Sequence, residues 1–177
     1  MVPESPLRKT DAGLVPEGDG WFVLNARDAL WREGDFGAYT RFEGDARFPQ
    51  LGINIGVLEP GQPACMYHRE DNQEDFLVLH GECLLLIEGQ ERHLRAWDFV
   101  HCPAWTEHVF VGAGDGPCAI LAIGSRTSRE VVYPRADVAL RHGAGVEQET
   151  ADPDLAYAPF AADVDTPYRD RWLGSET

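Results

Sequence analysis

The chain has 177 residues, a length that suits one domain. It carries 15 basic and 30 acidic residues, and its formal net charge of −15 at pH 7 repels nucleic-acid phosphates and anionic lipids. Hydrophobic residues make up 44% of the chain, which is enough for a core, but the longest apolar run, Cys83 to Ile87, is far too short to cross a membrane. We therefore expect a soluble protein that binds neither nucleic acid nor membrane.

The first residues, MVPESPLRKT, lack the apolar block of a secretory signal, which favours a cytoplasmic location. The four cysteines are scattered and form no C-x-x-C pair, so the sequence predicts neither a zinc ribbon nor a thioredoxin-type motif. Buried, reduced thiols in a cytosolic protein are the simplest interpretation.

The N-terminal part of the chain shows little regular pattern. Residues 1–20 are rich in proline, glycine and charge, and we expect a flexible leader there. The sequence WFVLN at 21–25 predicts a first strand. A helical turn could follow, but Gly34 and Gly37 interrupt it, so residues 21–49 are interpreted as that strand and a partly ordered covering segment.

From residue 51 the pattern changes to short apolar or alternating runs separated by glycine, proline and aspartate. The runs are LGINIGVL (51–58), ACMYH (64–68), DFLVLH (75–80), CLLLIE (83–88), ERHLRA (91–96), DFVHC (98–102), HVFVGA (108–113) and CAILAIGS (118–125). Many short strands at this spacing predict an antiparallel sandwich or barrel. Because CLLLI is apolar at every position, that strand is expected to be covered on both faces, which favours a closed architecture.

After residue 125 the strand pattern fades. The last part of the chain, residues 126–177, has acids, prolines and spaced aromatic residues, where a disordered segment would have fewer aromatics. We expect an arm that packs on the barrel or on a partner subunit. The rings that would hold it are Tyr133, Tyr157, Phe160, Tyr168 and Trp172.

Two separate segments carry candidate metal ligands. His68 and Glu70 share a face if the strand extends that far, since alternate strand residues point the same way. Glu74 begins the next run, and His108 begins a run much later in the chain. If these faces meet inside a barrel, two imidazoles and two carboxylates converge, and a metal ion would compensate their burial. Mixed nitrogen and oxygen ligands suit Fe, Mn, Ni, Co or Zn rather than Ca.

The same face also predicts a pocket, although these residues equally fit a plain barrel core. The candidates for its lining are Met66, Gln73, Phe76, Val78 and Phe110. Gln73 could also reach the metal as a neutral ligand or hydrogen-bond donor. His101 and Cys102 point to opposite faces of their strand, so one of them enters the barrel.

The spacing of these residues resembles that of the cupin family, over roughly residues 50–125. The first cupin motif, a glycine, then H-x-H, a glutamate and a second glycine, is matched by Gly61, His68-Arg69-Glu70, Glu74 and Gly81. The second motif is matched by the run PAWTEH, which ends at His108.

The chain departs from the family pattern at four positions. Glu70 replaces the second histidine of the first motif. In and around the second motif, Trp105 replaces a glycine, Gly112 an asparagine, and Trp97 stands where many cupins have a glycine.

The resemblance implies an all-β fold, an antiparallel double-stranded β-helix or jelly roll of the small-barrel cupin 2 type, with extended N- and C-terminal arms. It implies that His68, Glu74 and His108 are metal ligands, with Glu70 as a substituted fourth ligand or a residue that turns away. Many cupins dimerise, so a homodimer is expected.

Cupins include dioxygenases, lyases and isomerases, so the resemblance implies a metal-dependent enzyme in which Glu74 or Glu70 transfers a proton. An apolar pocket, with Arg69 facing away, favours a small uncharged or aromatic organic substrate. The alternatives are a non-enzymatic module that binds or senses a small molecule or a metal, and a barrel that has lost its metal through the Glu70 substitution.

Overall fold

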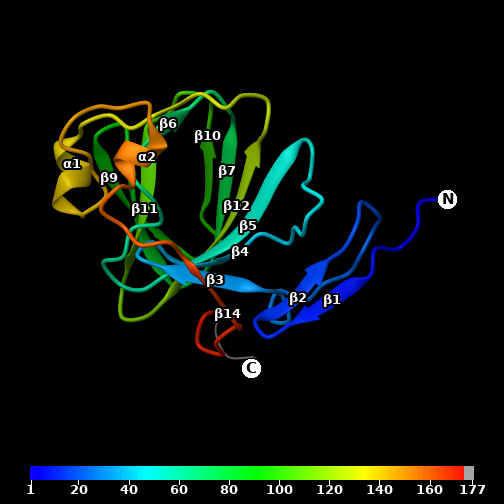
Figure 1. The fold of residues 1–177 in the computed structure, drawn as a ribbon. Helices are drawn as coiled ribbons and strands as arrows, with labels where there is room; N and C mark the ends of the chain where they lie inside the picture. Colours follow the sequence, from blue (N-terminus) through cyan, green and yellow to red (C-terminus); the bar gives the residue numbers. More distant parts are fainter. Residues whose placement is uncertain (174–177) are drawn as a thin grey trace.

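The structure, a computed structural model, describes residues 1–173, and its centre is an antiparallel barrel (Figure 1). The strands of its larger sheet are β3 (Trp31–Gly34), β4 (Gly37–Thr40), β5 (Leu51–Leu58), β7 (Glu74–His80), β10 (Phe99–Cys102), β12 (Cys118–Ser125) and β14 (Val164–Thr166). The strands of its smaller sheet are β8 (Glu82–Ile87), β9 (Gln90–Arg95) and β11 (His108–Ala113). The spatial orders are β10-β7-β12-β5-β4-β3-β14 and β11-β8-β9. The predicted all-β, jelly-roll class is therefore confirmed.

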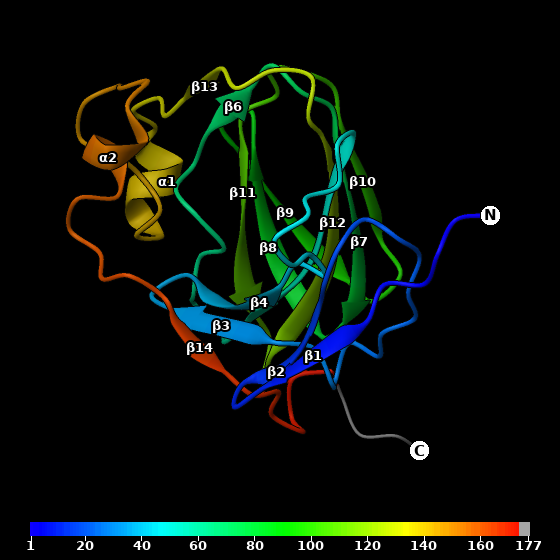
Figure 2. The ribbon, with the colours of Figure 1, turned by 45° about the vertical axis from the view of Figure 1, so that its right-hand side comes forward.

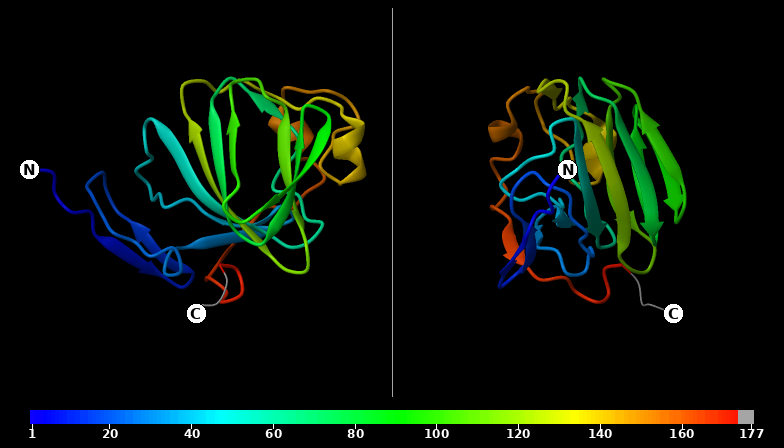
Figure 3. Two further views of the ribbon diagram at one scale, coloured as in Figure 1. Left: turned by 180° about the vertical axis from the view of Figure 1, so that it is seen from behind. Right: turned by 90° about the vertical axis from the view of Figure 1, so that its right-hand side faces the viewer.

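Short elements lie outside the two sheets. They are the hairpin β1 (Leu7–Thr10) and β2 (Gly13–Pro16), the pair β6 (Arg69–Glu70) and β13 (Val131–Val132), and the helices α1 (Asp137–Arg141) and α2 (Pro153–Ala156). The β1–β2 hairpin projects from the barrel on the side opposite α1 and α2 (Figures 1 and 3). The β6–β13 pair lies at one end of the barrel (Figure 2). Within residues 1–173, no helix is both long and apolar enough to span a membrane.

The barrel interior is filled by alternate residues of both sheets. It consists of Leu58, Phe76, Val78, Cys83, Leu85, Val100, Cys102, Phe110, Cys118 and Ile120. The intervening residues of β8, Leu84 and Leu86, point outward and pack against Val138 and Ala139 of α1. This is why every residue of CLLLI is apolar: one set faces the barrel interior and the other set faces the helix.

The C-terminal arm covers the outer face of the larger sheet. Strand β14 pairs with β3, with Thr166 opposite Trp31. Trp172 is 2% exposed, and its ring centroid lies 5.0 Å from that of the fully buried Trp31. Tyr168 packs on both indoles. A contact between residues this far apart in the chain fixes the arm to the barrel through apolar burial.

The N-terminal part differs from its sequence interpretation. Residues 7–16, assigned to a flexible leader, form the β1–β2 hairpin, and residues 21–25 contain no strand apart from an isolated bridge at Trp21. The hairpin is held by a segment further along the chain: Leu14 N–H donates to the Asp28 carbonyl, and Leu30 N–H donates to the Leu14 carbonyl. The strands β3 and β4 of the covering segment extend the larger sheet.

The expected strand over residues 64–68 is also wrong, because the segment is irregular. The backbone donors at its centre, Met66 and Tyr67, bind the C-terminal arm instead of a strand neighbour. Met66 N–H donates to Tyr157 Oη at 3.2 Å, and Tyr67 N–H donates to the Ala144 carbonyl at 2.7 Å. Since each donor can serve one partner well, a regular ladder cannot form here.

An ion pair between a buried glutamate and a partly exposed arginine secures the connection between β4 and β5. The side chain of Glu43 is 6% exposed and receives two hydrogen bonds from Arg126, at 2.6 Å from Nη1 and 3.0 Å from Nη2. It also accepts the Phe48 N–H at 2.8 Å. Burial opposes ionisation of Glu43, but the bonds from Arg126 and Phe48 outweigh it and lower the pKa of the carboxyl group.

We predict that Glu43→Gln lowers the free energy of unfolding at pH 7 by about 1–3 kcal/mol, because Arg126 loses a charged partner. The folded-state pKa of Glu43 lies below its unfolded value, so its contribution is complete above the unfolded pKa and is lost as pH falls through the folded pKa. Urea unfolding from pH 7 to pH 3 should show the two proteins converging at the acidic end. Glu147→Gln, at an exposed position, serves as the control. Equal stabilities at pH 7 would contradict the prediction.

Candidate metal centre

A reciprocal backbone pair places His68 opposite His108. His68 N–H donates to the His108 carbonyl at 3.2 Å, and His108 N–H donates to the His68 carbonyl at 2.8 Å. Residues that face each other in an antiparallel pair project their side chains to the same side. The two imidazole centroids are accordingly 4.9 Å apart.

The third member of the group comes from the larger sheet. Glu74 begins β7, and its Oε2 lies 3.3 Å from Nε2 of His108 and 3.8 Å from Nε2 of His68. The donor atoms of these three side chains all lie within 4.8 Å of one another. Of the two imidazoles and two carboxylates that the sequence predicts to converge, the structure thus brings together the two imidazoles and the carboxylate of Glu74.

Both imidazoles are oriented by their own backbone. Nδ1 of His68 lies 2.9 Å from the Met66 carbonyl, and Nδ1 of His108 lies 3.0 Å from the Thr106 carbonyl. A carbonyl only accepts, so Nδ1 carries the proton in each ring and Nε2 presents a lone pair to the centre of the group. This is the arrangement that fixes histidine ligands in metal sites.

Burial disfavours the charged form of all three groups in the absence of a cation. It raises the pKa of Glu74 to about 8, with a further contribution from the nearby Glu70 charge. It lowers the pKa of His108 to about 4, together with repulsion from His68, and it also lowers the pKa of His68. Burial therefore opposes an ion pair in the short contact between Glu74 and His108. Neutral imidazoles and a carboxylate in need of a positive partner fit a divalent transition metal.

Glu70 lies beside this group but outside it. It pairs with Val131 in the short β6–β13 sheet, and its carbonyl accepts the Trp105 N–H at 2.7 Å. Burial raises the pKa of its carboxyl group, and its charge contributes to the raised pKa of Glu74. Coordination of a metal by Glu70 stays a prediction.

The loop between Glu70 and Glu74 is fixed by Asn72, which the sequence analysis did not single out. Asn72 is buried, and its Oδ1 accepts hydrogen bonds from Thr127 N–H at 3.0 Å and Ser128 N–H at 3.1 Å. Its Nδ2 donates to the Ser128 carbonyl at 3.1 Å. The local sequence shows only an amide within an acidic cluster. The role of Asn72 could not be predicted from it, because the residues that it binds lie more than 50 residues further along the chain.

The structure separates the predicted pocket residues. Phe76 and Phe110 pack on each other, with ring centroids 4.7 Å apart, and line a cavity of about 250 Å³. Val78 is fully buried in the barrel interior, while Met66 packs with Tyr133 in a separate apolar cluster. Gln73 is exposed, with its Nε2 2.6 Å from Asp75 Oδ2.

On β10, Cys102 enters the barrel interior, and His101 faces outward with its Nδ1 2.6 Å from Asp75 Oδ1.

Two tyrosines of the C-terminal arm also reach the site. The Tyr133 ring lies 6.2 Å from the His68 ring, and Tyr157 holds the Met66 backbone. Both come from the segment whose spaced aromatics predicted packing on the barrel.

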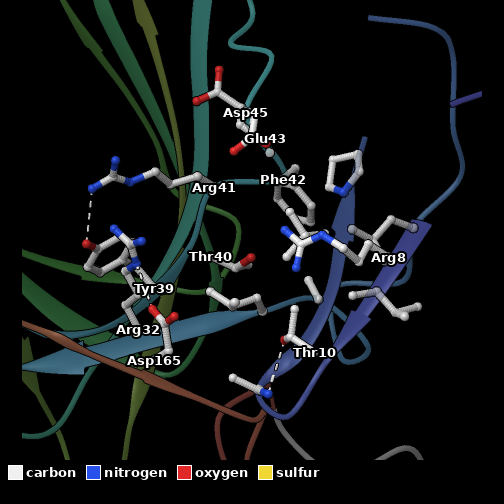
Figure 4. Close-up of a pocket in the computed structure, with 18 of the residues that line it drawn as sticks. Arg8, Thr10, Arg32, Tyr39, Thr40, Arg41, Phe42, Glu43, Asp45 and Asp165 are labelled. Atoms are coloured by element: carbon white, nitrogen blue, oxygen red, sulfur yellow. Dashed lines mark hydrogen bonds and ion pairs between the residues drawn. The ribbon is translucent and has the colours of Figure 1, made fainter. Parts of the chain in front are cut away.

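The 250 Å³ cavity adjoins the candidate metal ligands through Phe76, whose ring centroid is 5.3 Å from that of His108. A second cavity, of about 630 Å³, lies between the β1–β2 hairpin and the β3–β4 strands (Figure 4). The candidate metal ligands do not line it. Its charged lining is balanced, with Arg8, Arg32, Arg41 and Arg47 against Asp11, Glu43, Asp45 and Asp165.

Trp97 and Trp105, which stand where the cupin resemblance expects glycine, have φ values of 75° and 70°. This left-handed conformation is the one that glycine adopts without strain. Both tryptophans thus have a backbone conformation for which glycine is better suited. The turn at Trp105 leads directly into His108, and its bond to Glu70 joins the two motifs.

Comparisons with known proteins agree with this geometry. Residues 54–124 match the family model of the cupin domain. A search of the curated proteins found no match.

Among solved structures, the polyketide cyclase RemF from Streptomyces resistomycificus is similar at 12% identity and a TM-score of 0.54, over 63% of this chain and 84% of that protein. A cupin 2 domain-containing protein from Halorhodospira halophila has 19% identity and a TM-score of 0.50, over 65% of this chain and 86% of that one. A protein from Acidithiobacillus ferrooxidans has 28% identity and a TM-score of 0.43, over 47% of this chain, and the match spans 54% of its own length. The Streptomyces and Halorhodospira proteins share the fold of this chain, and residues 54–124 of this chain form a cupin domain.

Proposed function

We propose that the cupin domain binds one divalent transition metal ion through His68, Glu74 and His108, and that the protein is a metal-dependent enzyme acting on a small organic molecule. The observation that carries this proposal is the convergence of two backbone-anchored imidazoles on a buried carboxylate. Two histidines and one carboxylate leave coordination positions open for a substrate. A metal held there would supply Lewis-acid or redox chemistry to an oxygen-bearing group.

The surrounding side chains have separate roles in this proposal. Phe76 and Phe110 exclude water and form the floor of the adjoining cavity. Glu70 is our candidate for the proton-transferring group, because burial brings its pKa closer to neutral pH than that of an exposed glutamate. Glu74 is less suited to proton transfer, because its carboxyl group lies close to both imidazoles and is proposed to coordinate the metal.

The cavity favours an uncharged or aromatic substrate. Phe36, Phe76 and Phe110 provide aromatic walls. Arg69, the arginine next to the first histidine, is tied to Glu107 at 2.6 Å and does not line the cavity. Dioxygenase-like, lyase and isomerase reactions all suit such a site. A non-enzymatic cupin that binds a small molecule or a metal is the alternative, and it would show metal uptake without turnover.

We predict that each chain binds one metal ion after anaerobic addition of Fe(II), Mn(II) or Zn(II). His108→Ala should lower the metal affinity about 100-fold or more, because loss of a ligand costs more affinity than loss of a residue that only orients a ligand. Bound metal is measured by mass spectrometry after gel filtration, and affinity by competition with a chelator. The control is His93→Ala, which alters an exposed histidine of β9. Wild-type protein that takes up none of the three metals would refute the proposal.

A second variant separates the two glutamates. Because Glu70 lies outside the group of convergent donor atoms, we expect Glu70→Gln to keep the metal with an affinity within about threefold of wild type, while Glu74→Gln loses it. The same chelator competition measures both. Loss of the metal from Glu70→Gln would instead establish Glu70 as the fourth ligand.

We also propose that the protein forms a cytoplasmic homodimer. Light scattering should then give twice the chain mass of 19.7 kDa. A monomeric mass at micromolar concentration would exclude a stable dimer.

A further inference from the structure

The cavity beside the candidate metal ligands has one wall made of unusually small residues. In the larger sheet, Phe76 lies opposite Ala122, which in turn lies opposite Asn54. Two residues further along the strands, on the same face of the sheet, Ile120 lies opposite Gly56. Alanine and glycine at these positions leave room in front of β5 and β12, between the ring of Phe76 and the far edge of the cavity.

The backbone at position 56 does not require a glycine. Its φ is not positive, so its conformation is open to any residue, and a Cβ added there would meet nothing within 4 Å. The volume of the cavity, about 250 Å³, lies just below the ~300–1,000 Å³ range of pockets that hold drug-sized ligands. A small, flat molecule fits such a space.

The far edge of the cavity is formed by Arg41, directly after β4. Arg41 Nη2 donates to Tyr39 Oη at 3.1 Å, and its guanidinium lies 5.1 Å from the Tyr39 ring centroid. Figure 4 shows this side chain turned away from the side chains of the N-terminal hairpin. Within residues 1–173, it makes no ion pair with a carboxylate, although the chain contains 30 acidic residues.

The neighbouring polar group is Asn54, which also lines the cavity and makes no side-chain hydrogen bond among the described residues. An arginine and an amide at one end of an otherwise apolar space form donors for a carboxylate. Two strands, β12 and β5, lie between Glu74 on β7 and this end at β4, and the three steps between neighbouring strands correspond to about 14 Å at the usual strand spacing.

We propose that the ligand of this cavity is a small aromatic acid. Its carboxylate binds Arg41 and Asn54, and its rings lie over Gly56 and Ala122 beside Phe76, with the opposite end directed toward the candidate metal ligands. The inference rests on the proposed function for the identity of the reacting end, and it narrows the substrate class to acids with an aromatic body.

Binding of 2-naphthoate, with neutral naphthalene-2-carboxamide as its uncharged counterpart, tests the proposal by isothermal titration calorimetry on the metal-free and metal-loaded full-length protein. We expect the acid to bind the wild type in both forms. Arg41→Gln should weaken binding of the acid about 10-fold or more and leave binding of the amide unchanged, since only the acid pairs with the guanidinium. The matched control is Arg47→Gln, because Arg47 lines only the larger cavity.

A second pair of variants tests the location. Gly56→Leu fills the space in front of β5 and should abolish binding of both compounds, while Gly116→Leu, at another glycine with open space and no positive φ, should have no effect. Circular dichroism and thermal unfolding verify that each variant is folded. Weakening by Arg47→Gln, or normal binding to Gly56→Leu, would place the probe elsewhere and overturn the inference.

The outcomes separate this inference from the metal site. Binding of 2-naphthoate that depends on Arg41 supports the inference even in a protein that takes up no metal. Metal uptake without any binding of 2-naphthoate overturns the inference and leaves the proposed metal centre in place.

Discussion

The site depends on the reciprocal backbone pair between His68 and His108. The two histidines lie in different motifs, and the exchange of both hydrogen bonds sets them side by side with their rings on the same face. Each ring then repeats the same local geometry, with Nδ1 near the carbonyl two residues earlier. The backbone pair thus sets the positions of two candidate ligands, the two carbonyl contacts set their tautomers, and Glu74 enters from β7 to complete the group.

The part of this arrangement that could be predicted is the part encoded locally. Strands β5, β7, β8, β11 and β12 follow from alternation and turn residues, because each pattern is complete within its own segment. The three candidate ligands could be named because the spacing of the two motifs resembles that of the cupin family, and the strand pattern alone showed only that their faces could meet inside a barrel. The double covering of CLLLI was equally visible, because strand geometry requires two apolar environments for it.

The rest depends on partners far away in the chain. The β1–β2 hairpin needs residues 28–30, Asn72 needs residues 127 and 128, and the irregular backbone at Met66 needs Tyr157. No local pattern contains this information. Trp97 shows a different limit: a positive φ at tryptophan is unfavourable in itself, and only the surrounding turn imposes it.

Electrostatics connects the metal site with the cavity beside it. Burial raises the pKa of Glu74 to about 8 and lowers that of His108 to about 4, so the interior disfavours any uncompensated charge. A divalent cation placed among the carboxylates of Glu74 and Glu70 would already be neutralised, and would offer little attraction to a further anion. An acidic substrate therefore needs a positive charge of its own, away from the metal ligands. Arg41, which makes no direct ion pair with a carboxylate within residues 1–173, is the group proposed to supply that charge at the opposite end of the cavity.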